Sequence, residues 1–290
     1  MALRFGLIGQ GPWAKNIERT LLSLADVSVL AVDRTGVPSA KLDAVLVATP
    51  SASHAEVALP YIEAGLPTFI EKPLATTEAD AELIRDAALR SGAPIVVGHL
   101  YLHHPAFQKL LELLPTLGRV RYVLNESANN IPRSDTSVLW DWLPHDLSMA
   151  RAIFGEDAST AESWSLTGSV PPQAALSRFA FSSTSVVCTT SWLSPYRQKR
   201  LMIVCDSGTL VFDDRAEPKL AFHDAKANVS FPTYGHELPL TRQLERFAHA
   251  VRTGEHDPSQ LEAGMSVVRM IAAAERSIER GGDLVEVRPT

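Results

Sequence analysis

Two segments of the chain carry side chains suited to proton transfer and charge stabilisation. Lys72, within Glu71-Lys72-Pro73, follows a short apolar run that predicts a strand, and the carboxyl ends of strands line the ligand crevice in open α/β sheets. Asp141 and His145 lie four residues apart in a stretch that leads into a predicted helix ending at Gly155. A histidine accepts protons near neutral pH, and a neighbouring carboxylate can orient it and stabilise its charged form.

Each segment also has a purely structural interpretation. Lys72 can be a solvated lysine before a proline turn. Asp141 or Asp146 can cap the helix, and His145 can be a core residue with satisfied hydrogen bonds. Pro144 suits the first turn of a helix, which would leave Asp141 on the entering loop. If both residues were helical, Asp141 and His145 would share one face.

Three further histidines, His99, His103 and His104, follow the next predicted strand. Imidazoles at a strand end can bind a metal, but no cysteine or closely spaced carboxylate accompanies these three. We therefore expect no metal site, and we expect the histidines to line the cleft between two domains.

A glycine turn near the N-terminus has the spacing of a dinucleotide-binding loop. Gly9-Gln10-Gly11-Pro12-Trp13-Ala14 follows the pattern G-x-G-x-x-A between a predicted strand and a predicted helix. The first glycine makes the turn, the second admits a pyrophosphate to the backbone, and the small third residue lets helix and strand pack. The phosphate would lie at the helix N-terminus, where N–H groups and the helix dipole favour an anion.

Asp33 supports this interpretation and indicates which dinucleotide binds. It lies 24 positions after Gly9, close to the ~20 residues expected for an acid that binds a ribose hydroxyl. Because Asp33 would repel a 2′-phosphate, we expect NAD. The adjacent Arg34 could accept that phosphate, so NADP stays possible.

The elements around these residues divide the chain into two domains. In residues 1–98 single helices separate the strands, which implies a parallel sheet with right-handed crossovers and a Rossmann-type α/β domain. Only ten residues separate Asp33 from Ala44, so strand three of the usual fold is missing and the expected order is 2-1-4-5-6. The predicted strands are 3–8, 27–32, 44–48, 68–70 and 95–98, and the predicted helices are 14–24, 54–64 and 77–91.

Residues 99–290 follow a different pattern, with many strands that no helix separates. Most must pair antiparallel, which predicts an α+β domain with an open, mostly antiparallel sheet and helices on one face. Its uncovered face would leave the alternating apolar residues of 179–192 in water, so we expect a homodimer or a dimer of dimers through this sheet. The predicted strands are 119–127, 162–168, 175–181, 184–192, 201–205, 209–212, 220–223 and 284–287, and the predicted helices include 105–114, 240–252 and 259–280.

Composition limits the partners. Of 290 residues, 27 are Lys or Arg and 33 are Asp or Glu, giving a net charge of −6 without the basic patch of a nucleic-acid binder. No uninterrupted apolar run reaches the ~18 residues that suggest a membrane span. Cys188 and Cys205 lie in apolar runs, which predicts buried, reduced thiols. The N-terminal MALRFGLIG runs into a strand pattern without a signal-peptide layout, so we expect a cytoplasmic protein that binds neither nucleic acid nor membrane.

Five motifs follow one another along the chain: Gly9-x-Gly11-x-x-Ala14, Ala48-Thr49-Pro50 with His54, Glu71-Lys72-Pro73, Val97-Gly98-His99 and Asp141-x-x-x-His145. In this order they resemble the glucose-fructose oxidoreductase, inositol dehydrogenase and rhizopine-catabolism (Gfo/Idh/MocA) family, nearly end to end. The resemblance implies a Rossmann domain followed by an open antiparallel sheet domain. It also implies oxidation or reduction of sugars, cyclitols and their derivatives with NAD or NADP.

The resemblance assigns roles by position. It makes Lys72 the lysine that orients the reacting hydroxyl, and Asp141 and His145 the acid/base pair, so that hydride transfer accompanies proton transfer to His145. A dinucleotide- and sugar-binding sensor without catalysis is the alternative. The stretch that includes Arg133 and Asp135 is most similar to members acting on nucleotide-linked or amino sugars. The implied cofactor residues are Gly9, Gly11, Pro12, Trp13, Ala14, Asp33, Arg34, Thr49, Pro50, His54, Glu71 and Lys72, and the implied substrate residues are Lys72, His99, Arg133, Asp141 and His145.

Overall fold

The computed structural model describes residues 2–33, 41–182 and 184–287. Arg34, predicted to contact the cofactor, therefore lies outside the described residues. The chain divides into two compact units. The first comprises Met1–Leu100 and Glu237–Val268, and the second comprises Tyr101–His236 and Arg269–Thr290.

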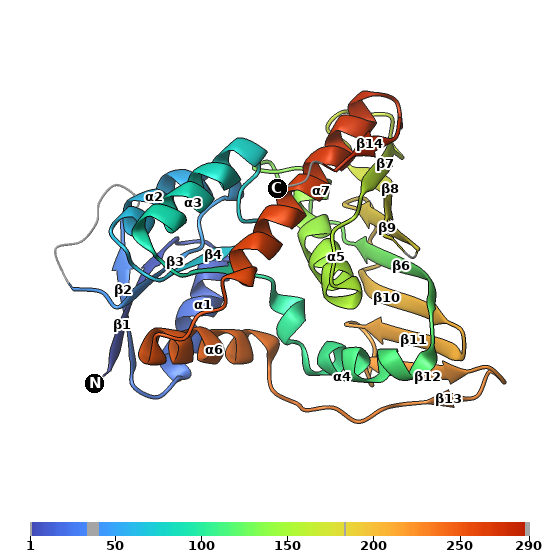
Figure 1. The fold of residues 1–290 in the computed structure, drawn as a ribbon, viewed down its shortest axis with the longest axis horizontal. Helices are drawn as coiled ribbons and strands as arrows, with labels where there is room; N and C mark the ends of the chain where they lie inside the picture. Colours follow the sequence, from blue (N-terminus) through green and yellow to red (C-terminus); the bar gives the residue numbers. More distant parts are fainter. Residues whose placement is uncertain (1, 34–40, 183, 288–290) are drawn as a thin grey trace. The chain divides into compact units, whose positions relative to one another are not determined.

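A five-stranded parallel sheet forms the centre of the first unit (Figure 1). Its order, β2-β1-β3-β4-β5, is the shortened Rossmann order that the sequence predicted, with no strand among the described residues between β2 and β3. Every residue of β3 and β4 is buried, as expected for strands covered on both faces. The strands are β1 (Leu3–Ile8), β2 (Val27–Val32), β3 (Ala44–Val47), β4 (Thr68–Glu71) and β5 (Ile95–Gly98).

Helices cover both faces of this sheet. α2 (His54–Glu63) and α3 (Glu78–Ser91) lie on one face, while α1 (Pro12–Ser23) and α6 (Pro239–Thr253) lie on the other (Figure 1). A short 3-10 turn, Ser51–Ser53, precedes α2.

α6 belongs to the first unit, whereas the predicted domain boundary at residue 98 left residues 237–268 in the second domain. Phe247 of α6 lies 5.6 Å, between ring centroids, from both Phe5 and Phe69, and Leu244 is buried in the same core. The first unit therefore completes its core with residues from near the C-terminus. The division between the units falls within α7 (Ser259–Glu279).

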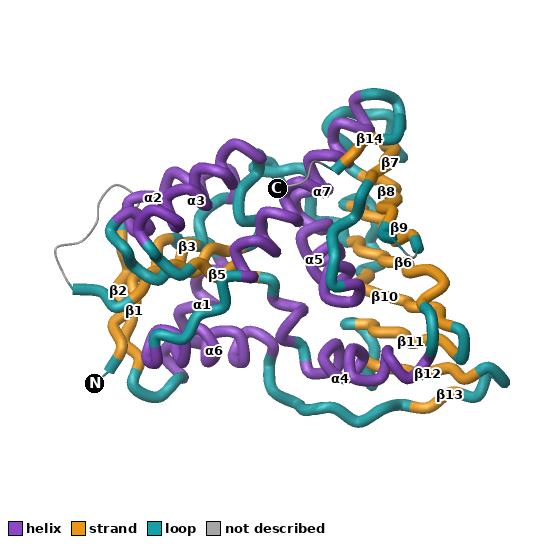
Figure 2. The backbone as a smooth tube through the Cα atoms, viewed as in Figure 1, coloured by secondary structure: helices purple, strands orange, loops and turns teal. Residues whose placement is uncertain are grey.

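The second unit is built on a nine-stranded sheet with the order β13-β12-β11-β10-β6-β9-β8-β7-β14 (Figure 2). β6 and β9 pair parallel, and the other neighbours pair antiparallel, which confirms the predicted mostly antiparallel sheet. The strands are β6 (Val120–Ala128), β7 (Thr160–Ser165), β8 (Ala174–Ala180), β9 (Ser185–Ser191), β10 (Gln198–Cys205), β11 (Gly208–Asp213), β12 (Leu220–Asp224), β13 (Val229–Ser230) and β14 (Val285–Glu286).

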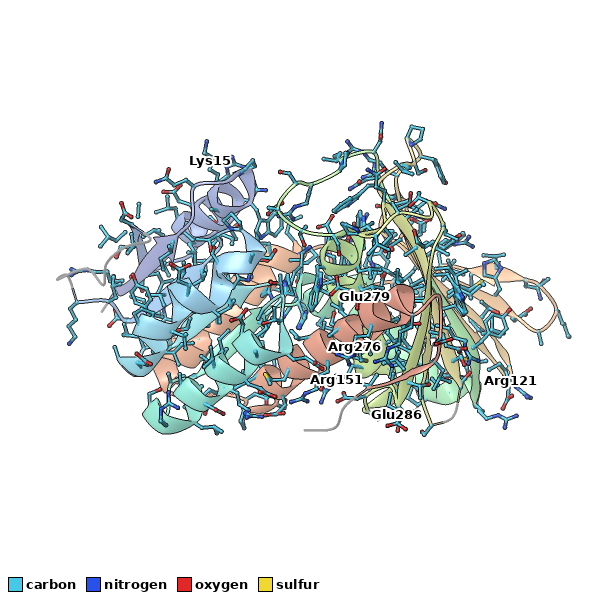
Figure 3. All side chains as sticks on the ribbon, turned by 90° about the horizontal axis from the view of Figure 1, so that it is seen from above. Lys15, Arg121, Arg151, Arg276, Glu279 and Glu286 are labelled. Atoms are coloured by element: carbon cyan, nitrogen blue, oxygen red, sulfur yellow. The ribbon has the colours of Figure 1, made fainter. Side chains whose placement is uncertain are left out.

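Helices α4 (Pro105–Leu113) and α5 (Val138–Phe154) pack against one face of this sheet. Phe107 of α4 contacts Phe212 of β11, and Asp146 of α5 pairs with Lys199 of β10. In Figure 3, Arg151 of α5 lies on the same side of the sheet as the end of α7. Two 3-10 turns, Leu100–His103 and Leu114–Leu117, flank α4.

The apolar residues from which we predicted an oligomer do not lie on the uncovered face of the second unit's sheet. The alternating apolar residues between 179 and 192, including Phe179, Val186 and Cys188, are fully buried on the helix-covered face. The other face carries the opposite set of residues. A row of half-buried apolar side chains crosses β11, β10, β6 and β9 there, because strand pairing places Val211, Met202, Leu124 and Val187 side by side.

The structure bears on two of the predictions, those for the two cysteines and for membrane spans. Cys188 and Cys205 are buried free thiols, as predicted. Burial raises the pKa of the Cys188 thiol well above its usual value, so this thiol is held protonated. Throughout the described ranges, every helix is too short or too polar to cross a membrane.

Candidate active site

The glycine turn of the first unit combines a close backbone approach with an open space. Gly9 has a φ of +137°, and a Cβ on it would lie 2.3 Å from the carbonyl oxygen of Ala48. Gly11 precedes α1 in an extended conformation, and a Cβ on it would meet nothing within 4 Å. No described side chain caps α1. The turn therefore leaves room for an anion at the N-terminus of the helix, as the dinucleotide pattern predicts.

The neighbouring residues of the motif lie where a Rossmann domain places them. Pro12 begins α1, and Ala14 is 1% exposed in the core. Asp33 is exposed directly after the carboxyl end of β2. These positions leave Asp33 accessible to a ribose at the end of the sheet.

His54 holds two loops of the first unit together. Its Nδ1 lies 2.7 Å from the carbonyl oxygen of Pro73, and its Nε2 lies 3.0 Å from that of Thr49. The loops that follow β3 and β4 are therefore tied by one side chain. His54 is only 1% exposed and holds these loops in position, and its predicted contact with the cofactor stays a prediction.

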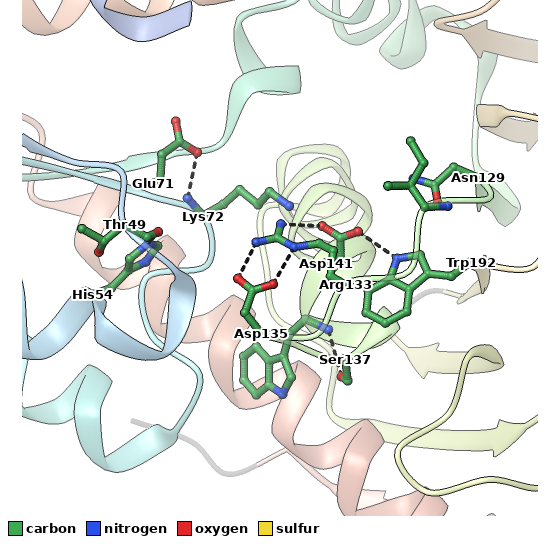
Figure 4. A network of polar contacts seen from close by, with 12 residues as sticks. Thr49, His54, Glu71, Lys72, Asn129, Arg133, Asp135, Ser137, Asp141 and Trp192 are labelled. Carbon is green, nitrogen blue, oxygen red and sulfur yellow. Dashed lines mark hydrogen bonds and ion pairs between the residues drawn. The ribbon is translucent and has the colours of Figure 1, made fainter. Parts of the chain in front are cut away.

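Glu71, at the end of β4, is a buried carboxyl group beside the glycine turn. Its Oε2 accepts a hydrogen bond from the backbone N–H of Lys72 at 3.2 Å, and Gly98 packs so closely that a Cβ there would lie 2.9 Å from the carboxyl oxygen (Figure 4). Burial raises the pKa of Glu71 to about 7, against the hydrogen bond from the Trp13 side chain and the charge of Lys72, which both lower it. Glu71 therefore titrates within the physiological range.

This titration predicts that Glu71→Gln stabilises the chain at high pH. In the folded state the pKa of Glu71 is about 7, above its ordinary value of 4.5, so the stability present at low pH is lost as the pH rises toward 7. A neutral glutamine escapes that loss, and the expected gain in the free energy of unfolding above pH 7 is at most about 3 kcal/mol. Urea unfolding between pH 5 and 8 measures it.

Glu56, an exposed glutamate of α2, supplies the matched control for that experiment. Glu56→Gln should follow the wild-type profile at every pH. Equal stability of wild type and Glu71→Gln at pH 8 would contradict the assignment.

In the second unit, α5 carries both Asp141 and His145. Ser137 begins the helix, and its hydroxyl accepts a hydrogen bond from the N–H of Trp140 at 3.5 Å. The helix therefore starts at Val138, six residues before Pro144, so that Pro144 lies inside it and not in its first turn. Asp141 and His145 are both helical, one turn apart on the same face. The predicted end at Gly155 is confirmed, with a φ of +69°.

Two donors orient the carboxylate of Asp141 (Figure 4). Trp192 donates its indole N–H to Oδ2 at 2.9 Å, and Arg133 donates to Oδ1 at 3.3 Å. Arg133 also forms a bidentate pair with Asp135, at 3.0 and 2.8 Å. Arg133, predicted to contact a substrate, is thus engaged by two carboxylates of its own unit. Sequence reasoning missed Trp192, because no spacing relates it to Asp141.

The imidazole of His145 lies against aromatic side chains. Tyr101 meets it edge-on with 5.1 Å between ring centroids, and Trp142 lies at 6.3 Å. The Tyr101 hydroxyl donates to Asp214 at 3.2 Å. His145 is half-buried, and in this setting it can exchange a proton with a small ligand.

The three histidines after β5 lie in different settings. His104 caps α4, since its Nδ1 accepts a hydrogen bond from the N–H of Ala106 at 3.1 Å. His99 is only 4% exposed in the first unit, so its side chain offers little surface to a substrate. His103 is half-buried in the 3-10 turn before α4. Within the described part of the chain, no three His, Cys, Asp or Glu side chains gather as metal ligands would.

Comparison with known proteins identifies the family of the chain. Residues 19–99 match the family described as "Oxidoreductase family, NAD-binding Rossmann fold" (GFO_IDH_MocA). The crystal structure of a proposed oxidoreductase from Magnetospirillum magnetotacticum MS-1 is 32% identical, with a TM-score of 0.83 over 94% of this chain and 99% of that chain. The chain belongs to the Gfo/Idh/MocA family.

Curated relatives within the Gfo/Idh/MocA family match part of the chain. Inositol 2-dehydrogenase 2 of Saccharopolyspora erythraea is 30% identical over 51% of this chain and 44% of its own length. UDP-N-acetylglucosamine 3-dehydrogenase of Acidithiobacillus ferrooxidans is 30% identical over 54% of this chain and 50% of its own length. The chain thus matches about half the length of these two relatives. The parallel sheet of its first unit is the NAD-binding Rossmann domain of the family.

Proposed function

We propose that this protein is an NAD-dependent dehydrogenase that oxidises a CH–OH group of a sugar, a cyclitol or a nucleotide-linked sugar. The observation that carries the proposal is the placement of Asp141 and His145 on one face of α5, with the carboxylate of Asp141 oriented by Trp192 and Arg133. Family membership supports NAD as the cofactor. The named activities of the two curated relatives, on inositol and on UDP-N-acetylglucosamine, support the substrate class.

The first unit would hold the cofactor. The open space at Gly11 and the N-terminus of α1 fit a pyrophosphate, and the exposed carboxylate of Asp33 fits the ribose hydroxyls. Asp33 would repel the 2′-phosphate of NADP, which favours NAD. Two more loops lie at the carboxyl end of the sheet. One contains Thr49 and Pro50, the other contains Lys72 and Pro73, and His54 joins them.

The side chains would divide the proton and charge transfers between them. His145 accepts the hydroxyl proton of the substrate, and Asp141 stabilises the resulting imidazolium. The role assigned to the ammonium of Lys72 is to stabilise the alkoxide that develops on the substrate. Bound NAD would supply the hydride acceptor for the oxidation of the alcohol to a ketone, and the proton would remain on His145.

A substrate panel tests the proposal. The purified chain is incubated with NAD or NADP and with myo-inositol, UDP-N-acetylglucosamine or simple hexoses, and formation of the reduced cofactor is followed by absorbance. Turnover of at least one compound, faster with NAD, is expected. Tight NADH binding without turnover of any compound would favour a sensor, and faster turnover with NADP would reverse the cofactor preference.

We also propose that the chain forms a homodimer, or a dimer of dimers, through the face of the second unit's sheet that carries Leu124 and Met202. The row of half-buried apolar side chains on that face supports this proposal, because a second copy of the chain would remove these side chains from water. Light scattering at micromolar concentration should give the mass of two or four chains, and Met202→Lys should lower it. Leu89→Lys, at an exposed leucine of α3, is the control and should leave the mass unchanged. A wild-type monomer would contradict the proposal.

A further inference from the structure

A buried ion pair includes the residue that follows the proposed proton acceptor in α5. Lys199 of β10 is 3% exposed and Asp146 of α5 is fully buried, and their ammonium and carboxylate groups are in contact. Ser127 of β6 joins them, since its hydroxyl donates to Asp146 at 3.0 Å and accepts from Lys199 at 3.1 Å. Two full charges are therefore held between the helix and two strands of the second unit.

Such a pair does little for the stability of the fold. The desolvation of two buried charges offsets most of their attraction, and neutral residues of similar size often fold as well. Removing a single partner is costly, because an unpaired charge is then buried. A buried pair does, however, restrict its neighbours to one arrangement, since both charges must keep their partners.

The neighbours of this pair include His145. Asp146 follows His145 in α5, and the ammonium of Lys199 lies 5.0 Å from the ring centroid of Tyr101. The Tyr101 ring meets the imidazole edge-on, and its hydroxyl is held by Asp214. Tyr101 is thus fixed at its face by a cation and at its hydroxyl by a carboxylate while it packs against His145.

We propose that Lys199 and Asp146, acting through the Tyr101 ring, hold the imidazole of His145 in the orientation that proton transfer requires. The three are positioning residues and need not touch the substrate. The catalytic consequence rests on the proposed function, because it matters only if His145 is the proton acceptor. The structural part, a single orientation of the His145 ring, can be measured without a substrate.

The test compares the double variant Lys199→Met/Asp146→Asn with the wild-type chain. The double variant removes both charges together, so no unpaired charge is buried. In chains labelled at histidine ¹³Cε1, the signal of His145 is identified by its loss in His145→Gln. We expect a sharp wild-type signal and a shifted or broadened one in the double variant. With the panel compound that the wild type oxidises fastest, kcat should fall tenfold or more while KM stays within twofold.

Tyr101 provides a second pair of variants that leaves the ion pair intact. Tyr101→Leu removes the ring that contacts His145 and should lower kcat tenfold or more, whereas Tyr101→Phe keeps the ring and should retain most of the rate. Lys109→Met is the control, because Lys109 forms an exposed pair with Glu112 on α4 and its loss should change neither readout. If the double variant fails to fold, the two Tyr101 variants decide the question.

The possible failures can be told apart. An unchanged His145 signal and an unchanged kcat in folded double and Tyr101→Leu variants would overturn this inference while leaving the dehydrogenase proposal in place. Wild-type turnover in His145→Gln would overturn the proposed function itself. If the wild type oxidises no compound of the panel, the NMR signal alone tests the positioning of the ring.

Discussion

Replacing either His145 or Lys72 is expected to remove most of the turnover, and the His145 variant should still bind NADH. Loss of a proton acceptor costs about 10²–10⁴-fold in rate, and loss of a positioned cation at a developing alkoxide has a similar effect. The contacts expected to bind NADH lie in the first unit, at the glycine turn, α1 and Asp33, and the His145 substitution alters none of them. Lys72→Ala should shift the free energy of unfolding by only about 0.5 kcal/mol, as a partly exposed side chain does.

Two measurements on each variant check this result. Fluorescence titration gives the NADH affinity, and single-turnover kinetics give the rate of hydride transfer. His145→Gln and Lys72→Met, which keep the approximate size of each side chain, should be as impaired as the alanine variants. Wild-type rates in both positions would exclude the catalytic assignment and leave the sensor as the better interpretation.

The two glycines of the turn should respond to alanine in opposite ways. Gly9→Ala would place a methyl group 2.3 Å from the Ala48 carbonyl oxygen at a φ of +137°, so we expect a loss of at least ~2 kcal/mol in the free energy of unfolding. Gly11→Ala meets nothing within 4 Å and has an ordinary extended backbone, so stability should change by less than about 0.5 kcal/mol. The new methyl group would instead occupy the space for the pyrophosphate and raise the Kd for NADH about tenfold or more.

Thermal unfolding and NADH titration of both variants separate these effects. Gly11→Ala serves as its own control for folding, because any loss of binding there occurs in a stable chain. An unchanged NADH affinity in Gly11→Ala would place the cofactor away from this turn. Unchanged stability in Gly9→Ala would show that β1 and β3 can separate to admit a side chain.

The sequence predicted features that depend on neighbouring residues better than features that depend on distant ones. The ten residues between Asp33 and Ala44 were too few for a third strand, and the observed sheet order follows from that count. The sequence left the start of α5 open, because a proline suits a first turn, whereas Ser137 supplies the cap seven residues before Pro144. The ranges of most strands in the second unit needed only alternation and turn signals.

Contacts between distant residues escaped prediction for a physical reason. Trp192 and Asp141 are 51 residues apart, and Lys199 and Asp146 are 53 apart, so each pair depends on how β9 and β10 register beneath α5. One signal was nevertheless present. Lys199 alternates with Leu201 and Ile203 along β10, which places a charged residue on the buried face of the strand. A buried lysine requires an anion, and Asp146 in the neighbouring helix is the one that the fold provides.

The discontinuous first unit has a consequence for the order of folding during synthesis. Its sheet needs α6 to cover Phe5 and Phe69, yet Phe247 is made after 178 further residues have been added beyond Phe69. On the ribosome, the part of one sheet face that α1 does not cover therefore stays exposed until most of the chain has emerged, although N-terminal domains commonly fold first. The second unit's strands, complete through β13 by residue 230, emerge before that happens. The dinucleotide-binding unit is therefore the first to be synthesised in part, but it can complete its core only after α6 has emerged.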